Sequence, residues 1–283
     1  MKGTLKPDQR FARHLLTALL AGLAVSAVAQ PPVPAPAVAA PAAAGPIPAP
    51  APGPAATPNG ATAAATAPPV LKPFAARYKV EAFGFSAGTA DIVLKNGAAG
   101  RYQYSTALHP RGLFRLVVPS NATLATSAET EGTSVRPLHY QEEDGTDSTS
   151  DDVTLDFDWT HGVVQGVAQD EAVRLPLPAN TQDPMSIQLA VLLDFANKRE
   201  PLRYSMVDKT KIKVYEYKSE GNARLETALG PLDTVIYSSN RPGQPDRLTR
   251  VWYAPALDYT PVRSEDINDG KLRIRMTILS LTR

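Results

Sequence analysis

From residue 73 to residue 283, apolar and polar side chains alternate in short runs. Residues 153–159 and 272–278 are the clearest examples, and residues 76–80 and 102–106 are shorter ones. A period of two buries one face of a β-strand and leaves the other face in water. Turn dipeptides such as Asn-Gly and Asp-Gly separate the runs. The pattern predicts a meander of about ten to thirteen antiparallel strands.

One segment departs from this alternation. Asp183 and Pro184 form a helix N-cap followed by proline at the first helical position. Residues 185–198 are then apolar on almost every side, and a helix of that kind has to be buried over most of its surface. We therefore expect a mainly β fold, a strongly curled antiparallel sheet or half-barrel wrapped around one apolar helix. A weaker helical turn is expected at residues 111–117.

The N-terminal segment predicts export. Basic residues precede an apolar run at residues 15–28, and Ala27-Val28-Ala29 fits the rule for signal peptidase. The run is shorter than the roughly 20 residues that span a bilayer core, which favours cleavage between Ala29 and Gln30. Residues 1–29 are thus interpreted as a signal peptide, and the mature chain as a periplasmic protein that is not integral to the membrane. The alternative is an uncleaved leader that tethers the chain to the inner membrane.

A Pro/Ala-rich tract follows the leader. Residues 30–71 contain no charged side chain and consist almost wholly of Pro, Ala, Gly and Thr. Proline withholds a backbone donor, and Ala and Gly bury little surface, so residues 30–72 are predicted to be a disordered linker. Its proline stretches could serve as ligands for an aromatic groove, but a plain spacer is our interpretation. Residues 73–283 then remain as a single β-rich domain.

The composition excludes several classes of function. The chain contains no cysteine, which excludes a lipobox, disulfides and cysteine-ligated metal. Its net charge is only +1, and basic residues of the leader contribute that excess, so no basic field exists to attract nucleic acid. Neither a glycine-rich phosphate loop nor an S-x-x-K motif occurs. We expect that the protein is not an enzyme and that it holds no cofactor.

Three histidines follow the predicted cleavage site: His109, His139 and His161. They lie in separate strands or turns, without the H-x-x-x-H or H-E-x-x-H spacing of a zinc site. His161 follows the strand predicted at residues 153–159 and is placed at a hairpin tip. We interpret it as a solvated turn residue rather than a general base.

Residues 142–152 are rich in acidic side chains. Clustered oxygen ligands in a turn can hold calcium. The spacing fits no EF-hand loop, however, and the charged tip of a long hairpin has the same composition. We expect a hairpin tip here and no metal site.

Three ordered motifs carry a resemblance to a known family: Leu-Pro-Leu-Pro and Asp-Pro-Met-Ser within residues 175–186, Leu-Glu-Thr-Ala-Leu-Gly within residues 225–235, and Trp-Tyr-Ala-Pro with Tyr-Thr-Pro-Val-Arg within residues 252–263. Together they resemble the exported Gram-negative proteins grouped as domain of unknown function 3108, over most of residues 73–283. The resemblance implies a periplasmic, β-rich protein, and it brings no activity, cofactor or catalytic residue. By analogy of fold alone, the expected sheet is similar to the lipoprotein-carrier half-barrel, which holds helices over an apolar cavity.

The last two motifs also have an interpretation from their residues alone. Proline ends strand pairing and limits the exposure of strand edges, so we assign these motifs to folding. Trp252 and Tyr253 are neighbours in one predicted strand and lie on its opposite faces. We expect one of the two in the core.

These observations favour a non-catalytic binding module of the cell envelope. In this hypothesis the curled sheet and its helix enclose a pocket for a lipid or other amphiphile. The alternative is an envelope scaffold or accessory protein that meets a partner protein through the acidic hairpin or the arginine-bearing strands. The ligand-binding residues are unknown from the sequence. An open apolar mouth would favour the first hypothesis, and a sealed interior would disfavour it.

Overall fold

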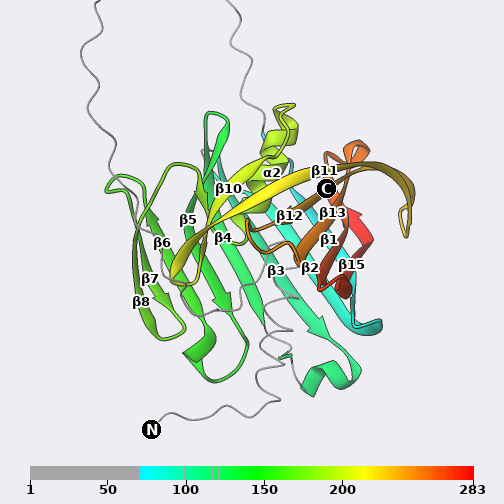
Figure 1. Ribbon diagram of the computed structural model, residues 1–283, viewed down its shortest axis with the longest axis horizontal. Coiled ribbons are helices and arrows are strands. Elements are labelled where there is room, and N and C mark those ends of the chain that lie inside the picture. Colours follow the sequence, from blue (N-terminus) through cyan, green and yellow to red (C-terminus); the bar gives the residue numbers. More distant parts are fainter. Residues whose placement is uncertain (1–69, 99, 117, 120–121) are drawn as a thin grey trace, which may run out of the picture. The chain divides into compact units, whose positions relative to one another are not determined.

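The structure is a computed structural model that describes residues 70–98, 100–116, 118–119 and 122–283 (Figure 1). All of these residues belong to one compact unit. The predicted signal peptide, its cleavage site at Ala29 and Gln30, and residues 30–69 of the predicted linker lie outside the described residues.

Fifteen strands, one α-helix and three short 3₁₀ helices make up the described residues. In chain order the strands are β1 (Phe74–Ala82), β2 (Phe85–Asn96), β3 (Arg101–Pro110), β4 (Thr123–Glu131), β5 (Ser134–Glu143), β6 (Val153–Asp158), β7 (Val163–Ala168), β8 (Glu171–Pro176), β9 (Thr181–Gln182), β10 (Arg203–Asp208), β11 (Lys211–Thr227), β12 (Gly230–Asn240), β13 (Arg247–Ala254), β14 (Thr260–Asn268) and β15 (Lys271–Thr282). The helices are η1 (Gly112–Leu116), η2 (Thr149–Asp151), α2 (Ser186–Ala196) and η3 (Pro255–Leu257).

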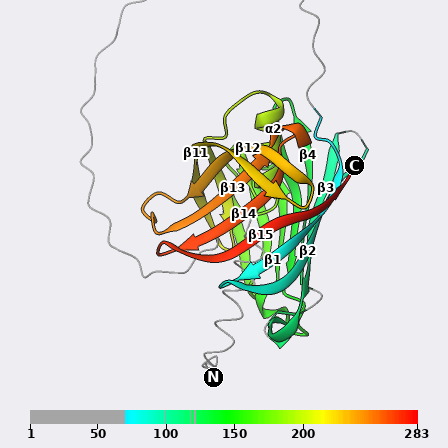
Figure 2. The same ribbon diagram turned by 90° about the vertical axis from the view of Figure 1, so that its right-hand side faces the viewer.

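All fifteen strands form one sheet, in the order β8-β7-β6-β5-β4-β3-β2-β1-β15-β14-β13-β12-β11-β10-β9. Chain neighbours pair antiparallel from β1 to β8 and from β10 to β15, β1 pairs with β15, and β9 lies parallel to β10. The consecutive strands β8 and β9 form the two opposite edges. Figure 2 shows β11 to β15 continuing into β1 and β2 as one wall. The predicted antiparallel meander is confirmed. The strand number of about ten to thirteen is too low, because β9 has two residues and β7 and β8 show little alternation.

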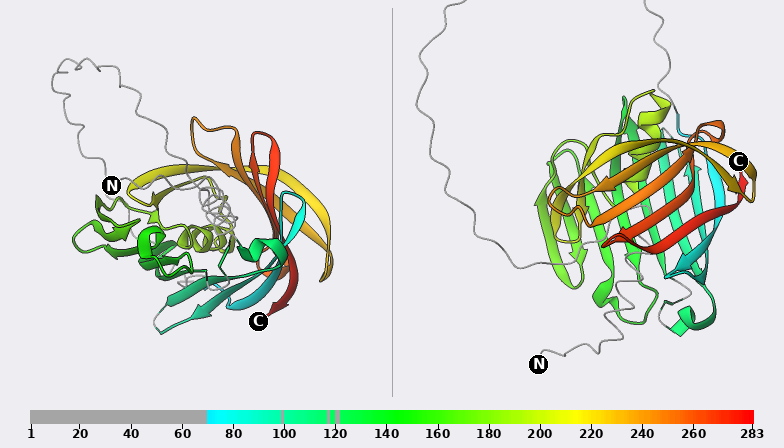
Figure 3. Two further views of the ribbon diagram at one scale, coloured as in Figure 1. Left: turned by 90° about the horizontal axis from the view of Figure 1, so that it is seen from below. Right: turned by 45° about the vertical axis from the view of Figure 1, so that its right-hand side comes forward.

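The sheet curls around helix α2, as the view along the strands shows (Figure 3). Nine of the eleven residues of α2 are buried. The helix packs on β4 and β5, and the side chain of Gln182 in β9 donates through Nε2 to the backbone oxygen of Val135 in β5 at 2.9 Å. Edge strand β9 therefore lies against β5. Strands β6, β7 and β8 extend the sheet beyond β5 to its other edge. The expected curled sheet around one apolar helix is confirmed.

The start of α2 depends on a buried carboxylate. Asp183 Oδ1 accepts hydrogen bonds from the backbone N–H groups of Met185 and Ser186 at 2.7 and 2.8 Å, as an N-cap does. Its other oxygen accepts from Thr126 Oγ1 of β4 at 2.7 Å. The side chain is fully buried, and this burial raises the pKa of Asp183 to about 6 in spite of the hydrogen bonds. One residue thus caps the helix and ties it to the sheet.

Two smaller expectations concern local structure. The weak helical turn expected at residues 111–117 is the 3₁₀ helix η1. Tyr253 is fully buried in the core, as one member of the Trp-Tyr pair was expected to be. Trp252 is also only 9% exposed, because Arg250 and Arg263 place their guanidinium groups 5.9 and 5.6 Å from the centre of its ring. The alternation in the sequence does not predict that two arginine side chains cover the outer face of Trp252.

Candidate functional site

An open pocket of about 480 Å³ lies where the C-terminal end of α2 meets the start of β1 and helix η3. Its inner wall is apolar and comes from the neighbouring strands β1 and β2 and from α2, which lies about a hundred residues later in the chain. Leu71 and Phe74 precede and begin β1, Leu94 belongs to β2, and Leu192 and Phe195 belong to α2. All five side chains are less than 9% exposed, so the wall is a continuation of the core. The pocket is open to the surface, and its inner wall is apolar.

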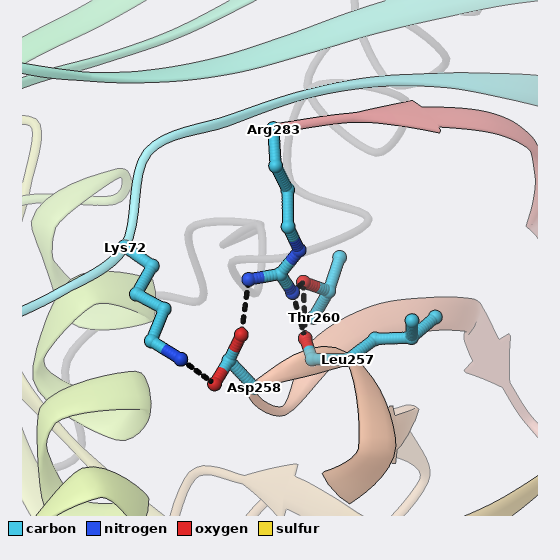
Figure 4. A network of polar contacts seen from close by, with 5 residues as sticks. All are labelled: Lys72, Leu257, Asp258, Thr260 and Arg283. Atoms are coloured by element: carbon cyan, nitrogen blue, oxygen red, sulfur yellow. Dashed lines mark hydrogen bonds and ion pairs between the residues drawn. The ribbon is translucent and has the colours of Figure 1, made fainter.

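The rim of this pocket is charged. Lys72 Nζ lies 2.7 Å from Asp258 Oδ1, and Arg283 pairs with the other oxygen of the same carboxylate (Figure 4). Arg283 also donates to the backbone oxygen of Leu257, which accepts a further hydrogen bond from Thr260 Oγ1 at 2.7 Å. Hydrogen bonding from Lys72, with the positive charge of Arg283, lowers the pKa of Asp258.

The rim holds more cations than anions among its described side chains. Lys72, Arg283 and Lys198 line the pocket, and Asp258 is the single carboxylate in its lining. Lys198 follows the C-terminus of α2 with a φ of 57°. The pocket therefore combines an apolar interior with a positive edge, and this combination suits an amphiphile with a negative head.

The backbone beside the rim is strained. Asp258 and Tyr259 are consecutive residues with φ values of 48° and 57°, in the left-handed region that side chains disfavour. The N–H of Tyr259 donates to the backbone oxygen of Ala254 at 2.9 Å, which closes the turn. In this backbone conformation the ring of Tyr259 stacks on the ring of Phe195 in α2. The motif at residues 252–263, assigned to folding from the sequence, also builds a wall of the pocket.

A second, smaller pocket of about 270 Å³ lies on the other side of α2, between β5 and β10. Its most buried charged residue, Asp194, accepts a hydrogen bond from the hydroxyl of Tyr204 at 2.5 Å and pairs with Arg199. Arg199 Nη1 in turn donates to Thr133 Oγ1 at 2.7 Å. These polar groups form hydrogen bonds and an ion pair with one another. We therefore interpret them as structural contacts that hold α2 against the sheet.

The three histidines do not come together. His109 lies on β3, His139 on β5 and His161 in the turn between β6 and β7, and each faces a separate aspartate. Of the three, His161 has the most exposed side chain, at 76%, and it contacts Asp158 three residues earlier. Its interpretation as a solvated turn residue is confirmed. Within the described residues, no group of three or more His, Asp or Glu side chains is arranged to hold a metal ion.

A G-x-S-x-G motif, which we had taken to be absent from the sequence, does occur. Residues 84–88 read Gly-Phe-Ser-Ala-Gly, which matches the G-x-S-x-G of α/β-hydrolases. That motif needs a sharp turn from a strand into a helix, whereas Ser86 lies inside β2, directly after a hairpin turn. The nearest histidine, His109 on the neighbouring strand, bonds through Nε2 to Asp91 at 3.0 Å. The geometry is that of a hairpin and not of a nucleophile elbow.

The acidic residues at 142–152 form the connection between β5 and β6. Asp144 is buried, and its Oδ1 accepts from the N–H and the hydroxyl of Thr146, both at 2.7 Å. Asp152 accepts from the N–H of Asp144 at 3.0 Å, and Ser148 caps η2. The stretch is a folded hairpin tip, as expected, and the carboxylates of Asp144 and Asp152 support its turns.

The pocket residues gave no local signal in the sequence. Lys72 and Asp258 are 186 residues apart, and only the pairing of β1 with β15 brings the start and the end of the sheet together.

Among the described residues, no helix has the length and apolar character needed to cross a bilayer.

A family model described as "Protein of unknown function (DUF3108)" matches residues 74–277. No curated protein sequence matches the chain. Among solved structures, the chain is similar to a β-barrel-like protein of domain of unknown function DUF1849 from Brucella abortus, with a TM-score of 0.49 and 10% identity, covering 75% of this chain and 98% of that one. It is also similar to the MucA/MucB complex of Pseudomonas aeruginosa, with a TM-score of 0.36 and 13% identity over 74% of this chain and 51% of that one. At these values the likenesses carry no argument about function.

Proposed function

The chain belongs to the DUF3108 family of proteins of unknown function, and we propose that it is a non-catalytic binding module for a lipid or other amphiphile in the cell envelope. The apolar segment of the ligand lies against Phe74, Leu192 and Phe195, and its head meets the charged rim. The predicted signal peptide places this module in the periplasm.

One observation carries the proposal, the open pocket of about 480 Å³ with an apolar wall and a rim of three cations. Small-molecule sites are typically clefts of about 300–1,000 Å³ that are mostly apolar and hold a few polar groups. The rim cations favour an anionic head, such as a carboxylate or a phosphate. Lys72 and Arg283 already share Asp258, so they are held in place before a ligand arrives.

The same pocket gives no support for catalysis. Among the described residues that line it, the polar side chains are three cations and one carboxylate, with Tyr259 and Thr260, and none is a histidine. The histidines elsewhere are spread over the outer surface. The scaffold alternative uses the acidic hairpin or the arginine-bearing strands as its contact surface, and within that hairpin Asp144 and Asp152 already bond inside their own connection.

Native mass spectrometry of protein purified from the envelope tests the proposal first. We expect adducts of amphiphile mass that are released by organic solvent. Uptake of a fluorescent fatty acid by the delipidated protein provides the second measurement. Bare protein in the first experiment together with no uptake in the second would contradict the proposal.

A pair of substitutions locates the ligand. Ala196 lines the pocket mouth and is exposed, so Ala196→Trp fills the mouth without disturbing the core. We expect its affinity for the fluorescent fatty acid to fall at least roughly tenfold, about 1.4 kcal/mol. The matched control is Ala172→Trp, which adds the same side chain at an exposed position of β8. Equal affinities for the two variants would place the ligand outside this pocket.

A further inference from the structure

Exposed apolar side chains gather at the end of the sheet where β1 turns into β2. Among the described residues, the three most exposed large hydrophobic side chains are Leu116 at 82%, Leu113 at 81% and Phe85 at 71%. Single exposed hydrophobic residues are common on protein surfaces, but a group of them marks a contact site. We call these three residues the apolar tip.

The three residues come from two neighbouring connections. Phe85 begins β2, directly after the turn from β1, whereas Leu113 and Leu116 lie in η1 between β3 and β4. The N–H of Arg111 donates to the backbone oxygen of Ala87 at 2.8 Å, which holds η1 against the start of β2. Figures 1 and 3 show η1 and the β1–β2 turn at the same end of the sheet.

The fold holds the leucines outward. In a 3₁₀ helix, residues i and i+3 lie on the same face, so Leu113 and Leu116 project together. Phe114 packs against the core, and Val118, which is 1% exposed, donates its N–H to the backbone oxygen of Phe114 at 2.8 Å. Phe114 and Val118 thus anchor the connection in the core, and Leu113 and Leu116 project from it into solvent.

The charged side chains that flank the leucines of the apolar tip in the chain are basic. Residues 82–90 and 110–122 contain Arg111 and Arg115 and no acidic residue. Both arginines are exposed, and Arg115 Nε donates to the backbone oxygen of Pro110 at 3.2 Å, which leaves the rest of its guanidinium group available. Acidic side chains lie farther out at the same end of the sheet: Glu81 is opposite Ser86, Glu143 is opposite Thr123, and residues 142–152 connect β5 to β6.

We propose that the apolar tip docks onto a bilayer surface that contains anionic lipids. Leu113, Leu116 and Phe85 enter the boundary between head groups and acyl chains, and Arg111 and Arg115 bind lipid phosphates above them. A bilayer fits better than a protein partner, because these side chains come from two separate connections. A protein would need a matching hollow for each of them, while acyl chains adapt to any shape.

This contact and the pocket use opposite ends of the same strand. Phe74 at the first position of β1 lines the pocket, and the turn beside the apolar tip follows Ala82 at its last position. A docked molecule therefore presents its pocket mouth to the aqueous side. The docking proposal does not depend on the pocket having a ligand.

A single label tests the proposal, because the chain contains no cysteine. Leu116→Cys carries an environment-sensitive fluorophore at the apolar tip, and Ala98→Cys carries it in the β2–β3 turn, at the other end of β2. With vesicles of phosphatidylglycerol and phosphatidylethanolamine, we expect a blue shift and quenching by acyl-chain quenchers at position 116 and neither effect at position 98. Equal responses at both positions, or none at position 116, would overturn the proposal, and this comparison holds whether or not the leader is retained.

Two charge variants test the part played by the arginines. The double substitution Arg111→Glu and Arg115→Glu should weaken vesicle binding at least tenfold, and the remaining binding should lose most of its salt dependence. The matched control reverses an exposed charge on β11 through Lys218→Glu and should bind like the unchanged protein. Unchanged binding by the double variant, or insertion that is equally strong in phosphatidylcholine vesicles, would contradict recognition of anionic lipid. A position-116 response to a purified envelope protein but not to vesicles would assign the apolar tip to a protein partner instead.

Discussion

The rings of Phe195 and Tyr259 stack with their centroids 4.5 Å apart and their planes at 13°. Phe195 also meets Tyr253 and Tyr237 edge-on, at 5.0 and 5.4 Å. The last turn of α2 is thus held by three aromatic side chains of the wall formed by β12, β13 and the turn before β14. Because Tyr259 reaches this position only with a φ of 57°, the stack depends on a strained backbone.

Substitutions at Tyr259 should separate the stack from the strain. Tyr259→Ala removes the ring contact and keeps the unfavourable φ, so we expect a loss of about 2 kcal/mol in the free energy of unfolding. Tyr259→Gly also removes the ring but adopts a positive φ without penalty, which should return about 1 kcal/mol. Urea unfolding at equilibrium measures both values. A glycine variant less stable than the alanine variant would show that the backbone at this position is not strained.

Removing the rim carboxylate should strengthen binding, because the negative charge that competes with the ligand for Lys72 and Arg283 outweighs its help in holding them in place. Asp258→Asn keeps a side chain that tolerates the left-handed conformation, and it releases Lys72 and Arg283 from their shared partner. We expect roughly two- to fivefold tighter binding of an anionic fatty acid at low salt, the range that an exposed ion pair represents. Asp233→Asn, which removes an exposed carboxylate of β12, is the control. Weaker binding by the Asp258 variant would mean that holding Lys72 and Arg283 in place contributes more to binding than releasing them.

Local patterns in the sequence predicted the elements of this fold but not the site. Alternation identified β6 and β15 together with their buried faces, and the Asp-Pro pair identified the start of α2. The rim could not be found in this way, since the position of Lys72 beside Asp258 depends on the closure of β1 onto β15. The apolar tip was equally hidden, because the inward and outward residues of η1 are all apolar and only the packing of Phe114 and Val118 distinguishes them.

The buried cap of α2 should make stability depend on pH. Burial raises the pKa of Asp183 in the folded state to about 6, above its ordinary value of 3.8. Between these pH values the folded chain binds the proton more tightly than the unfolded chain, so the free energy of unfolding falls as the pH rises from about 4 to about 6. Each tenfold difference in proton affinity between the two states is worth about 1.4 kcal/mol, so this contribution amounts to about 2–3 kcal/mol.

Asp183→Asn isolates that contribution, because asparagine also caps helices and does not titrate. Urea unfolding of both proteins between pH 4 and pH 7 should show the unchanged chain gaining stability relative to the variant as the pH falls. Asp233→Asn serves as the exposed control. Parallel profiles for the chain and its Asp183 variant would mean that the carboxyl group titrates alike in the folded and unfolded states.

The hairpin of β6 and β7 contains two glycines that should respond differently to alanine. A Cβ at Gly166 would lie 2.0 Å from the backbone oxygen of Thr154 on β6, and the residue has a φ of 155°. Gly162, in the turn of the same hairpin, has a φ of 64° and no other heavy atom within 4 Å of a Cβ. Gly166→Ala must move two paired strands apart and should cost more than about 2 kcal/mol, whereas Gly162→Ala should cost only about 1 kcal/mol for its backbone conformation. Chemical denaturation of the two variants measures the difference, and equal losses would show that β7 can shift away from β6 at no cost.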